Sequence, residues 1–133
     1  MPEFAGMSHL SLSVRNRDAS RDWYHEVLGF EPLEELRTDA YDEWILLHPV
    51  NRMVLCLQQH KANGGEEFDP TRTGGDHLGL KVDSRAELNA WAAWFAEKGV
   101  THSPIVDATY GSVLTFKDPD RFQLEMFHRP NHP

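Results

Sequence analysis

The sequence predicts an α+β fold made of two tandem copies of one βαβββ module. Residues 8–14 (SHLSLSV) match residues 76–82 (DHLGLKV), which lie 68 positions further along the chain. Gly29 and Gly99, which each follow a predicted helix, are 70 positions apart. Offsets that stay between 68 and 70 over successive elements indicate an internal duplication.

Each copy is expected to open with a strand and a helix. Residues 8–14 and 76–82 alternate apolar and polar side chains, which is the pattern of a half-buried strand. Residues 18–28 and 85–98 carry apolar side chains at helical spacing. The glycine after each helix suits the left-handed conformation beyond a C-terminus, and Ser84 with Glu87 forms a capping box at the start of the second helix.

Three further strands complete each predicted module. They cover residues 33–38, 44–48 and 53–57 in the first copy and residues 103–107, 112–116 and 122–126 in the second, with 33–38 and 103–107 the weaker patterns. A polar segment with four glycines separates the copies and reads as a connector. The expected organisation is a flexible tail at 1–6, a single domain at 7–128 (module one 7–59, connector 60–75, module two 76–128) and a tail at 129–133.

Composition narrows the classes of function. The formal charge is −8 over 133 residues, so no large positive field attracts nucleic acid. Neither an apolar stretch of about 18 residues nor a signal peptide is present, which argues against a membrane partner. The single cysteine, Cys56, cannot form an internal disulfide, in keeping with a reducing compartment. We therefore expect a cytoplasmic protein with a small-molecule partner.

Three side chains are candidates for one metal site. Alternation places His9 and His77 on the more polar face of their strands, and places Glu125 away from the core of module two. A lone strand histidine is often merely solvated. Two histidines at equivalent positions of a repeat, with a glutamate on the last strand, supply two imidazole nitrogens and one carboxylate to a divalent ion. Cys56 occupies the position in module one that Glu125 occupies in module two.

Over residues 7–128 the sequence resembles the vicinal oxygen chelate superfamily, the group of glyoxalases, bleomycin-resistance proteins and extradiol dioxygenases. The matching pieces are His9-Leu10, the helix end Leu28-Gly29-Phe30, His77-Leu78-Gly79 and the segment FKDPD…LE at 116–125. The resemblance implies that the modules curl into curved mixed sheets around one divalent metal ion (Fe, Zn, Ni or Mn), with His9, His77 and Glu125 as ligands. It also implies a homodimer in which His9 of one chain joins His77 and Glu125 of the other.

Departures from the family's subgroups leave the reaction open. Cys56 stands where glyoxalase I carries a carboxylate or amide. Val113 and Thr115 stand near positions where fosfomycin thiol transferases carry Ser and Tyr, and Arg121 replaces the usual Gly of the dioxygenases. The resemblance thus implies a divalent-metal-dependent enzyme, dioxygenase-like or glyoxalase/lyase-like, that chelates vicinal oxygens of a small organic substrate. The alternative is a metal-free drug- or metabolite-binding protein of the bleomycin-resistance type.

Two further roles are expected near the metal. Tyr110 is the nearby phenol that can relay a proton, so it joins Glu125 as a candidate catalytic residue. Phe127, Cys56 and Trp44 are candidate residues of the substrate pocket, because aromatic and thiol side chains suit a flat or apolar ligand.

Overall fold

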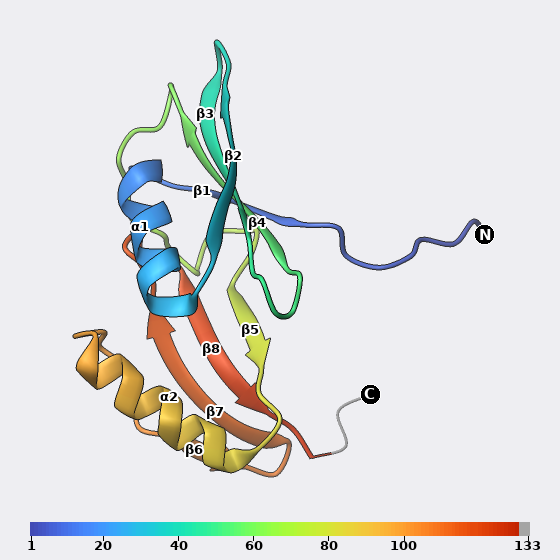
Figure 1. Ribbon diagram of the computed structural model, residues 1–133, viewed down its shortest axis with the longest axis vertical. Coiled ribbons are helices and arrows are strands. Elements are labelled where there is room, and N and C mark those ends of the chain that lie inside the picture. The colour runs from blue at the N-terminus through green and yellow to red at the C-terminus, as the bar shows by residue number, and fades with distance from the viewer. Residues whose placement is uncertain (131–133) are drawn as a thin grey trace. The chain divides into compact units, whose positions relative to one another are not determined.

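The computed structural model describes residues 1–130 of the chain. The chain divides into two compact units, Met1–Glu66 and Glu67–Pro133, and each unit contains one helix and one four-stranded sheet (Figure 1). No helix in this part of the chain is long and apolar enough to cross a membrane.

Module one follows the predicted order of elements. It contains β1 (Leu10–Ser13), α1 (Arg17–Leu28), β2 (Glu31–Arg37), β3 (Tyr41–Leu47) and β4 (Val54–His60). The strand order in the sheet is β1-β4-β3-β2, with β1 parallel to β4 and the other pairs antiparallel. The sheet is therefore mixed.

Module two repeats this topology. Its elements are β5 (His77–Lys81), α2 (Arg85–Glu97), β6 (Val106–Ala108), β7 (Gly111–Lys117) and β8 (Gln123–His128), in the sheet order β5-β8-β7-β6. Only β5 and β8 are parallel. The predicted α+β fold with two βαβββ modules is confirmed.

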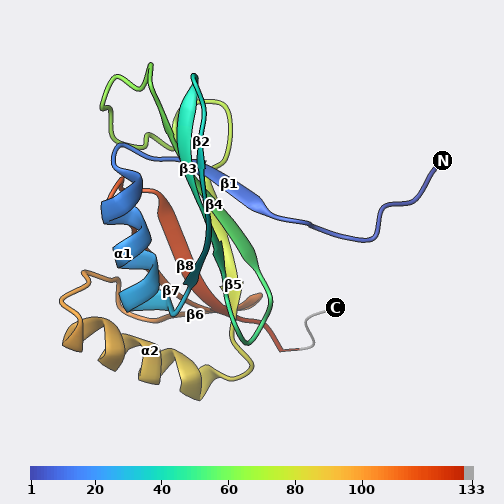
Figure 2. The same ribbon diagram turned by 45° about the horizontal axis from the view of Figure 1, so that its top comes forward.

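Helix α1 covers one face of its own sheet (Figure 2). The Asn16 side chain caps the helix by accepting hydrogen bonds from two backbone N–H groups, and Gly29 ends it at φ 75°, where a side chain would be strained. Tyr24 and Val27 are buried on the sheet side, as are the α1-facing leucines of β3 and β4.

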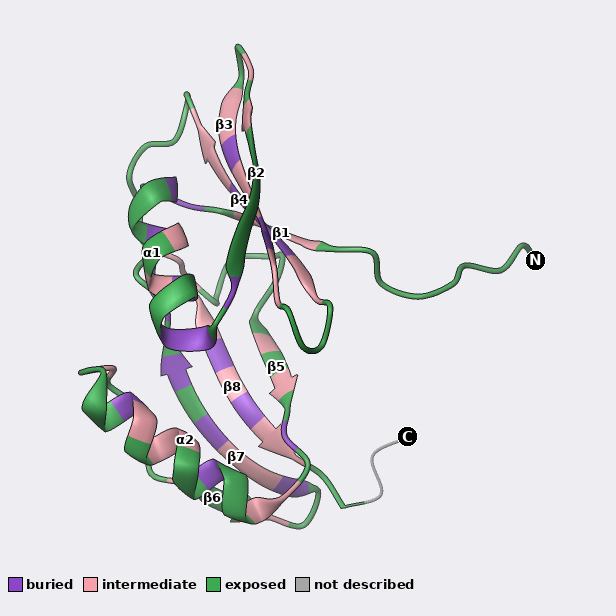
Figure 3. Cartoon of the chain, viewed as in Figure 1, coloured by how far each residue is buried: buried purple, intermediate pink, exposed green. Residues whose placement is uncertain are grey.

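Helix α2 packs in the same way on β7 and β8, and all three elements contain buried residues (Figure 3). Ser84 Oγ accepts a hydrogen bond from Glu87 N, as the capping box predicts. The Glu87 carboxylate accepts from Asp83 N, one residue before the cap. Phe95 is fully buried, and its ring centroid lies 4.4 Å from that of Phe116 on β7.

The strand expected at 103–107 is mostly absent, because β6 spans only Val106–Ala108. Pro104 has no backbone N–H and cannot continue a ladder of hydrogen bonds. His102 makes an isolated bridge to Phe116, and Ser103 Oγ accepts from Thr115 N at 3.0 Å. Ser103 N also donates to Thr115 O at 2.9 Å, so this segment keeps local contacts with β7 without forming a regular strand. Of the predicted tail at 129–133, residues 131–133 lie outside the described residues.

Candidate functional site

The parallel pairing of β5 with β8 builds the centre of the candidate site. Its register sets His77 opposite Gln123 and Gly79 opposite Glu125. Leu124 on β8 is buried in the core, so Glu125 lies on the opposite face, away from α2. His77 and Gly79 point to that same face of the sheet.

His77 and Glu125 come together there. His77 Nε2 lies 3.8 Å from Glu125 Oε1, and the side chains are 50% and 22% exposed. Ligands bound at 2.0–2.2 Å to one ion lie roughly 3–3.5 Å apart, so a small closing movement lets both groups bind the same cation. An imidazole nitrogen and a carboxylate oxygen are also a donor set that divalent transition metals accept. These two residues therefore fit a metal ion.

Gly79 provides the space for the carboxylate. A Cβ atom added at this glycine would lie 3.1 Å from Glu125 Oε1 and 3.7 Å from Glu125 Cγ. The first separation is shorter than an ordinary van der Waals contact, and the second lies within the ordinary range. The sequence analysis assigned no role to Gly79. Comparison of the two repeats could have drawn attention to it, because module one has Ser11 at the equivalent position.

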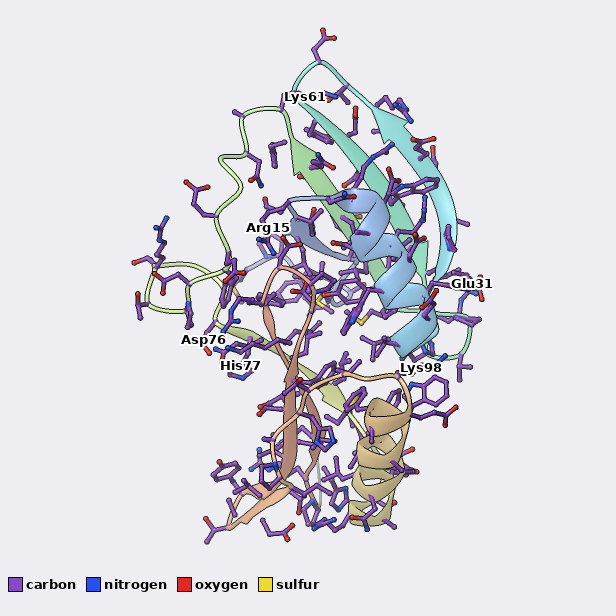
Figure 4. The ribbon with its side chains drawn as sticks, turned by 90° about the vertical axis from the view of Figure 1, so that its left-hand side faces the viewer. Arg15, Glu31, Lys61, Asp76, His77 and Lys98 are labelled. Carbon is purple, nitrogen blue, oxygen red and sulfur yellow. The ribbon has the colours of Figure 1, made fainter. Side chains whose placement is uncertain are left out.

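Asp76 holds the other side of the His77 ring. Its Oδ1 lies 2.7 Å from His77 Nδ1, and the two side chains lie together where the connector enters β5 (Figure 4). This hydrogen bond is the main reason that the pKa of His77 lies above its usual value; burial opposes it, and the negative charges of Glu125 and Asp76 add to the rise.

The third predicted ligand, His9, belongs to module one. It is exposed and directly precedes β1, and its Nδ1 lies 3.2 Å from the hydroxyl of Ser8. Within neither module do three or more His, Cys, Asp and Glu side chains of residues 1–130 form a group that could hold a metal. Of the predicted ligand set, module two brings together His77 and Glu125.

Cys56 occupies the position equivalent to Glu125, opposite Ser11 of β1. Its thiol is buried, and burial raises the pKa of Cys56, as do the negative charge of Glu43 and a hydrogen bond to that carboxylate. Because metals bind the thiolate, a thiol with a raised pKa is a poor ligand at neutral pH.

Glu43 is a polar residue that the sequence analysis missed. It is buried on β3 opposite Gln58, whose Nε2 donates to Glu43 Oε1 at 2.8 Å. It points to the same side of the sheet as Cys56, away from α1. The expected strand at 44–48 began one residue too late to include it, whereas β3 starts at Tyr41.

The candidate pocket residues lie on different faces. Trp44 pairs with the buried Leu57 on the α1 side of the sheet, and its Nε1 donates to Asp18 on that helix at 2.6 Å. The structure therefore separates Trp44 from Cys56, which is on the other face. Strand alternation is the reason: Cys56 pairs with the residue that follows Trp44, and neighbouring residues of a strand point to opposite faces.

Phe127 and Tyr110 are neighbours in module two. Phe127 lies two residues after Glu125 on β8 and therefore on the same face. The Tyr110 ring, in the turn before β7, is 6.3 Å from the Phe127 ring and largely exposed. Phe127 thus stands between Tyr110 and the carboxylate of Glu125 along this face.

An open pocket of about 270 Å³ lies at the far end of β4 in module one. It is lined by Arg15, Asp42, Gln59, His60, Lys61, Asn63 and Gly65. Arg15 and Lys61 are labelled in Figure 4, and Lys61 Nζ is paired with Asp42 at 2.7 Å. His60 is six residues from the start of β4, about 20 Å along a strand from the end that adjoins His9. The pocket includes none of the predicted site residues.

The two modules thus share one topology, a four-stranded mixed sheet with a helix on one face, and in module two His77 and Glu125 lie on the opposite face. The family model of the Glyoxalase/Bleomycin resistance protein/Dioxygenase superfamily matches residues 6–126. The chain belongs to this superfamily. No curated protein matches the sequence.

Solved structures share the fold. The glyoxylase/bleomycin resistance protein/dioxygenase domain from Frankia sp. EAN1pec is 32% identical with a TM-score of 0.88, covering 96% of this chain and 100% of that one. A glyoxalase family protein from Enterococcus faecalis is 24% identical with a TM-score of 0.77, covering 93% and 98%. The fosfomycin resistance protein FosX from Listeria monocytogenes, in complex with Mn(II) and sulfate, is 16% identical with a TM-score of 0.72, covering 97% and 96%.

Proposed function

We propose that the protein is a divalent-metal-dependent enzyme in which His9, His77 and Glu125 bind one metal ion. Vicinal oxygens of a small organic substrate chelate this ion. The observation that carries the proposal is the His77–Glu125 pair, whose ligand atoms are 3.8 Å apart above the space left by Gly79. The Mn(II) bound to FosX of the same fold supports the choice of a divalent ion.

A homodimer completes this site in our proposal. His77 and Glu125 supply two protein ligands, whereas catalytic metal sites have three and keep a position open for substrate. His9 of one chain joins His77 and Glu125 of the other, which produces two equivalent sites under two-fold symmetry.

When bound, the ion supplies Lewis-acid stabilisation of negative charge that develops on substrate oxygens. Glu125 serves as both ligand and catalytic carboxylate, and Tyr110 Oη donates or accepts a proton at the rim of the site. Phe127 and Tyr110 form an aromatic wall against which a flat or apolar substrate packs. In this proposal Cys56 joins the substrate pocket as a neutral thiol. This arrangement serves dioxygenase-like and glyoxalase/lyase-like chemistry.

Metal binding tests the proposal directly. Protein purified without oxygen and without an affinity tag is analysed for bound metal and titrated with Mn²⁺ by calorimetry. We expect one ion per chain in the wild type and loss of stoichiometric binding in His77→Ala, because two remaining ligands hold a labile ion poorly. His60→Ala, another strand histidine, is the matched control and keeps the metal. Wild-type protein that binds no divalent ion would refute the enzyme and favour a metal-free drug- or metabolite-binding protein.

Mixing two inactive variants tests the shared site. His9→Ala and Glu125→Ala proteins are combined in equal amounts after reversible unfolding. Random pairing makes half of the dimers heterodimers, each with one intact site, so we expect about one ion per four chains. No recovery from dimers that do form, or a monomer in sedimentation that binds metal, would refute sharing between chains.

A further inference from the structure

We infer that Asp76 is a positioning residue that fixes the tautomer and orientation of His77 for metal binding, and that Ser8 holds His9 less firmly from the equivalent position. This inference rests on the proposed metal site. It concerns residues that neither contact the ion nor form part of the predicted ligand set.

The first step is the direction of the hydrogen bond at His77. A carboxylate only accepts hydrogen bonds, so the 2.7 Å contact with Asp76 Oδ1 places the proton on Nδ1. In the neutral ring, Nε2 then carries the free lone pair. Nε2 is also the atom that faces Glu125. The contact therefore selects the tautomer in which the available nitrogen already points at the second ligand.

The second step concerns orientation. The His77 side chain is 50% exposed, and little packing fixes its ring. An imidazole that turns away from Glu125 must be reordered on binding, which lowers the affinity. The hydrogen bond to Asp76 limits this motion. Carboxylates that hold a ligating histidine in this way contribute about 10–100-fold to metal affinity.

Asp76 itself is not placed to bind the same ion. Its oxygen contacts the Nδ1 side of the ring, whereas the ion would lie beyond Nε2 on the other side. The hydrogen bond, the width of the ring and a metal–nitrogen bond together put Asp76 Oδ1 about 6 Å from such an ion. Asp76 therefore acts through His77.

The repeat provides an internal comparison. Ser8 precedes His9 as Asp76 precedes His77, and it makes the corresponding contact with Nδ1 at the longer distance of 3.2 Å. A hydroxyl both donates and accepts, so it fixes neither tautomer. It also lacks the charge that strengthens a hydrogen bond. The two histidines of the proposed site are thus held unequally.

The test compares Mn²⁺ affinity in four full-length variants by calorimetry at one pH. We expect Asp76→Ala to weaken binding by about 10–100-fold and Asp76→Asn to lose less, because the amide oxygen still accepts from Nδ1. Ser8→Ala should lose about threefold or less on the same reasoning. Asp83→Asn removes an equal charge from beyond the other end of β5, and we expect affinity near that of the wild type.

A second measurement does not depend on metal. The ¹⁵N shifts of the His77 ring report its tautomer in the metal-free protein, and we expect the Nδ1–H form in the wild type and a shift toward Nε2–H in Asp76→Ala. The melting temperature should stay unchanged, since Asp76 is exposed. Equal affinities of wild type and Asp76→Ala, or an unchanged tautomer, would overturn the inference. Failure of the wild type to bind Mn²⁺ would instead refute the proposed function, and the tautomer measurement would still test the hold of Asp76 on His77.

Discussion

Replacement of Gly79 by alanine tests whether the metal site depends on the space opposite Glu125. The new Cβ would lie 3.1 Å from Glu125 Oε1. Ordinary contacts begin at about 3.4 Å, so the carboxylate must move by roughly 0.3 Å, away from the new Cβ on β5. Gly79 has an unstrained backbone, and alanine can adopt its conformation without a cost in φ.

The size of the effect follows from that displacement. Metal–ligand distances vary by about 0.2 Å, so a shift of roughly 0.3 Å exceeds what the coordination geometry absorbs. We expect Mn²⁺ affinity to fall by about tenfold, or ~1.4 kcal/mol. The metal-free protein should change in unfolding free energy by less than about 1 kcal/mol, because alanine restricts the unfolded chain and this gain offsets the crowding.

The assay pairs calorimetric titration of Mn²⁺ with urea denaturation of the metal-free protein. Gly75→Ala is the matched control, since its added Cβ would meet its nearest neighbour, Phe122, at 4.0 Å. Gly75→Ala is expected to keep wild-type affinity. A Gly79→Ala protein that also keeps wild-type affinity would show that the carboxylate needs no such space, and the assignment of Glu125 as a ligand would lose its geometric support.

Two further predictions concern the interiors of the modules. The raised pKa of Cys56 leaves little thiolate near pH 8, so alkylation by iodoacetamide should be slow; Glu43→Gln removes the charge that raises this pKa, which should increase the rate several-fold and move its pH midpoint downward. Mass spectrometry from pH 7 to 10 measures both rates, with the denatured proteins as reference, and equal profiles would contradict the role of Glu43. In module two, Phe95→Ala should cost about 3–5 kcal/mol in urea denaturation because its ring is fully buried against Phe116, and a loss below about 1 kcal/mol would contradict this packing.

The fold was predictable because its signals are periodic and occur twice. Alternation identified β1 and β5, and each helix has a local stop signal such as Gly29. The exception is β6, where Pro104 interrupts the strand that a weak pattern suggested and Ser103 pairs with Thr115 through one backbone and one side-chain hydrogen bond. Such short outer strands are decided by individual hydrogen bonds, which a pattern of hydrophobicity does not encode.

The site was less predictable because it depends on register across strands. Alternation assigns Glu125 to a face, but it does not state which residue of β5 lies opposite, so the space at Gly79 was not evident. The contact between Asp76 and His77 depends in the same way on a side-chain rotamer. Alternation alone could have separated Trp44 from Cys56. Trp44 lies two positions from the core residue Leu46 and therefore on the core face, whereas Cys56 lies on the other face.

The two modules carry unequal chemistry at equivalent positions. Module two has a carboxylate at Glu125 and a glycine opposite it, whereas module one has a buried thiol at Cys56 and a serine opposite it. If the proposed shared site had a carboxylate at both equivalent positions, it would bring two negative charges to one ion. With a neutral thiol in one copy, the proposed set of His9, His77 and Glu125 carries a single negative charge, and the bound ion keeps net positive charge for substrate oxygens. Replacing Cys56 by glutamate should therefore tighten Mn²⁺ binding while reducing that residual charge. Calorimetry measures the affinity for Mn²⁺, and competition with an anionic vicinal diol measures the residual charge of the bound ion.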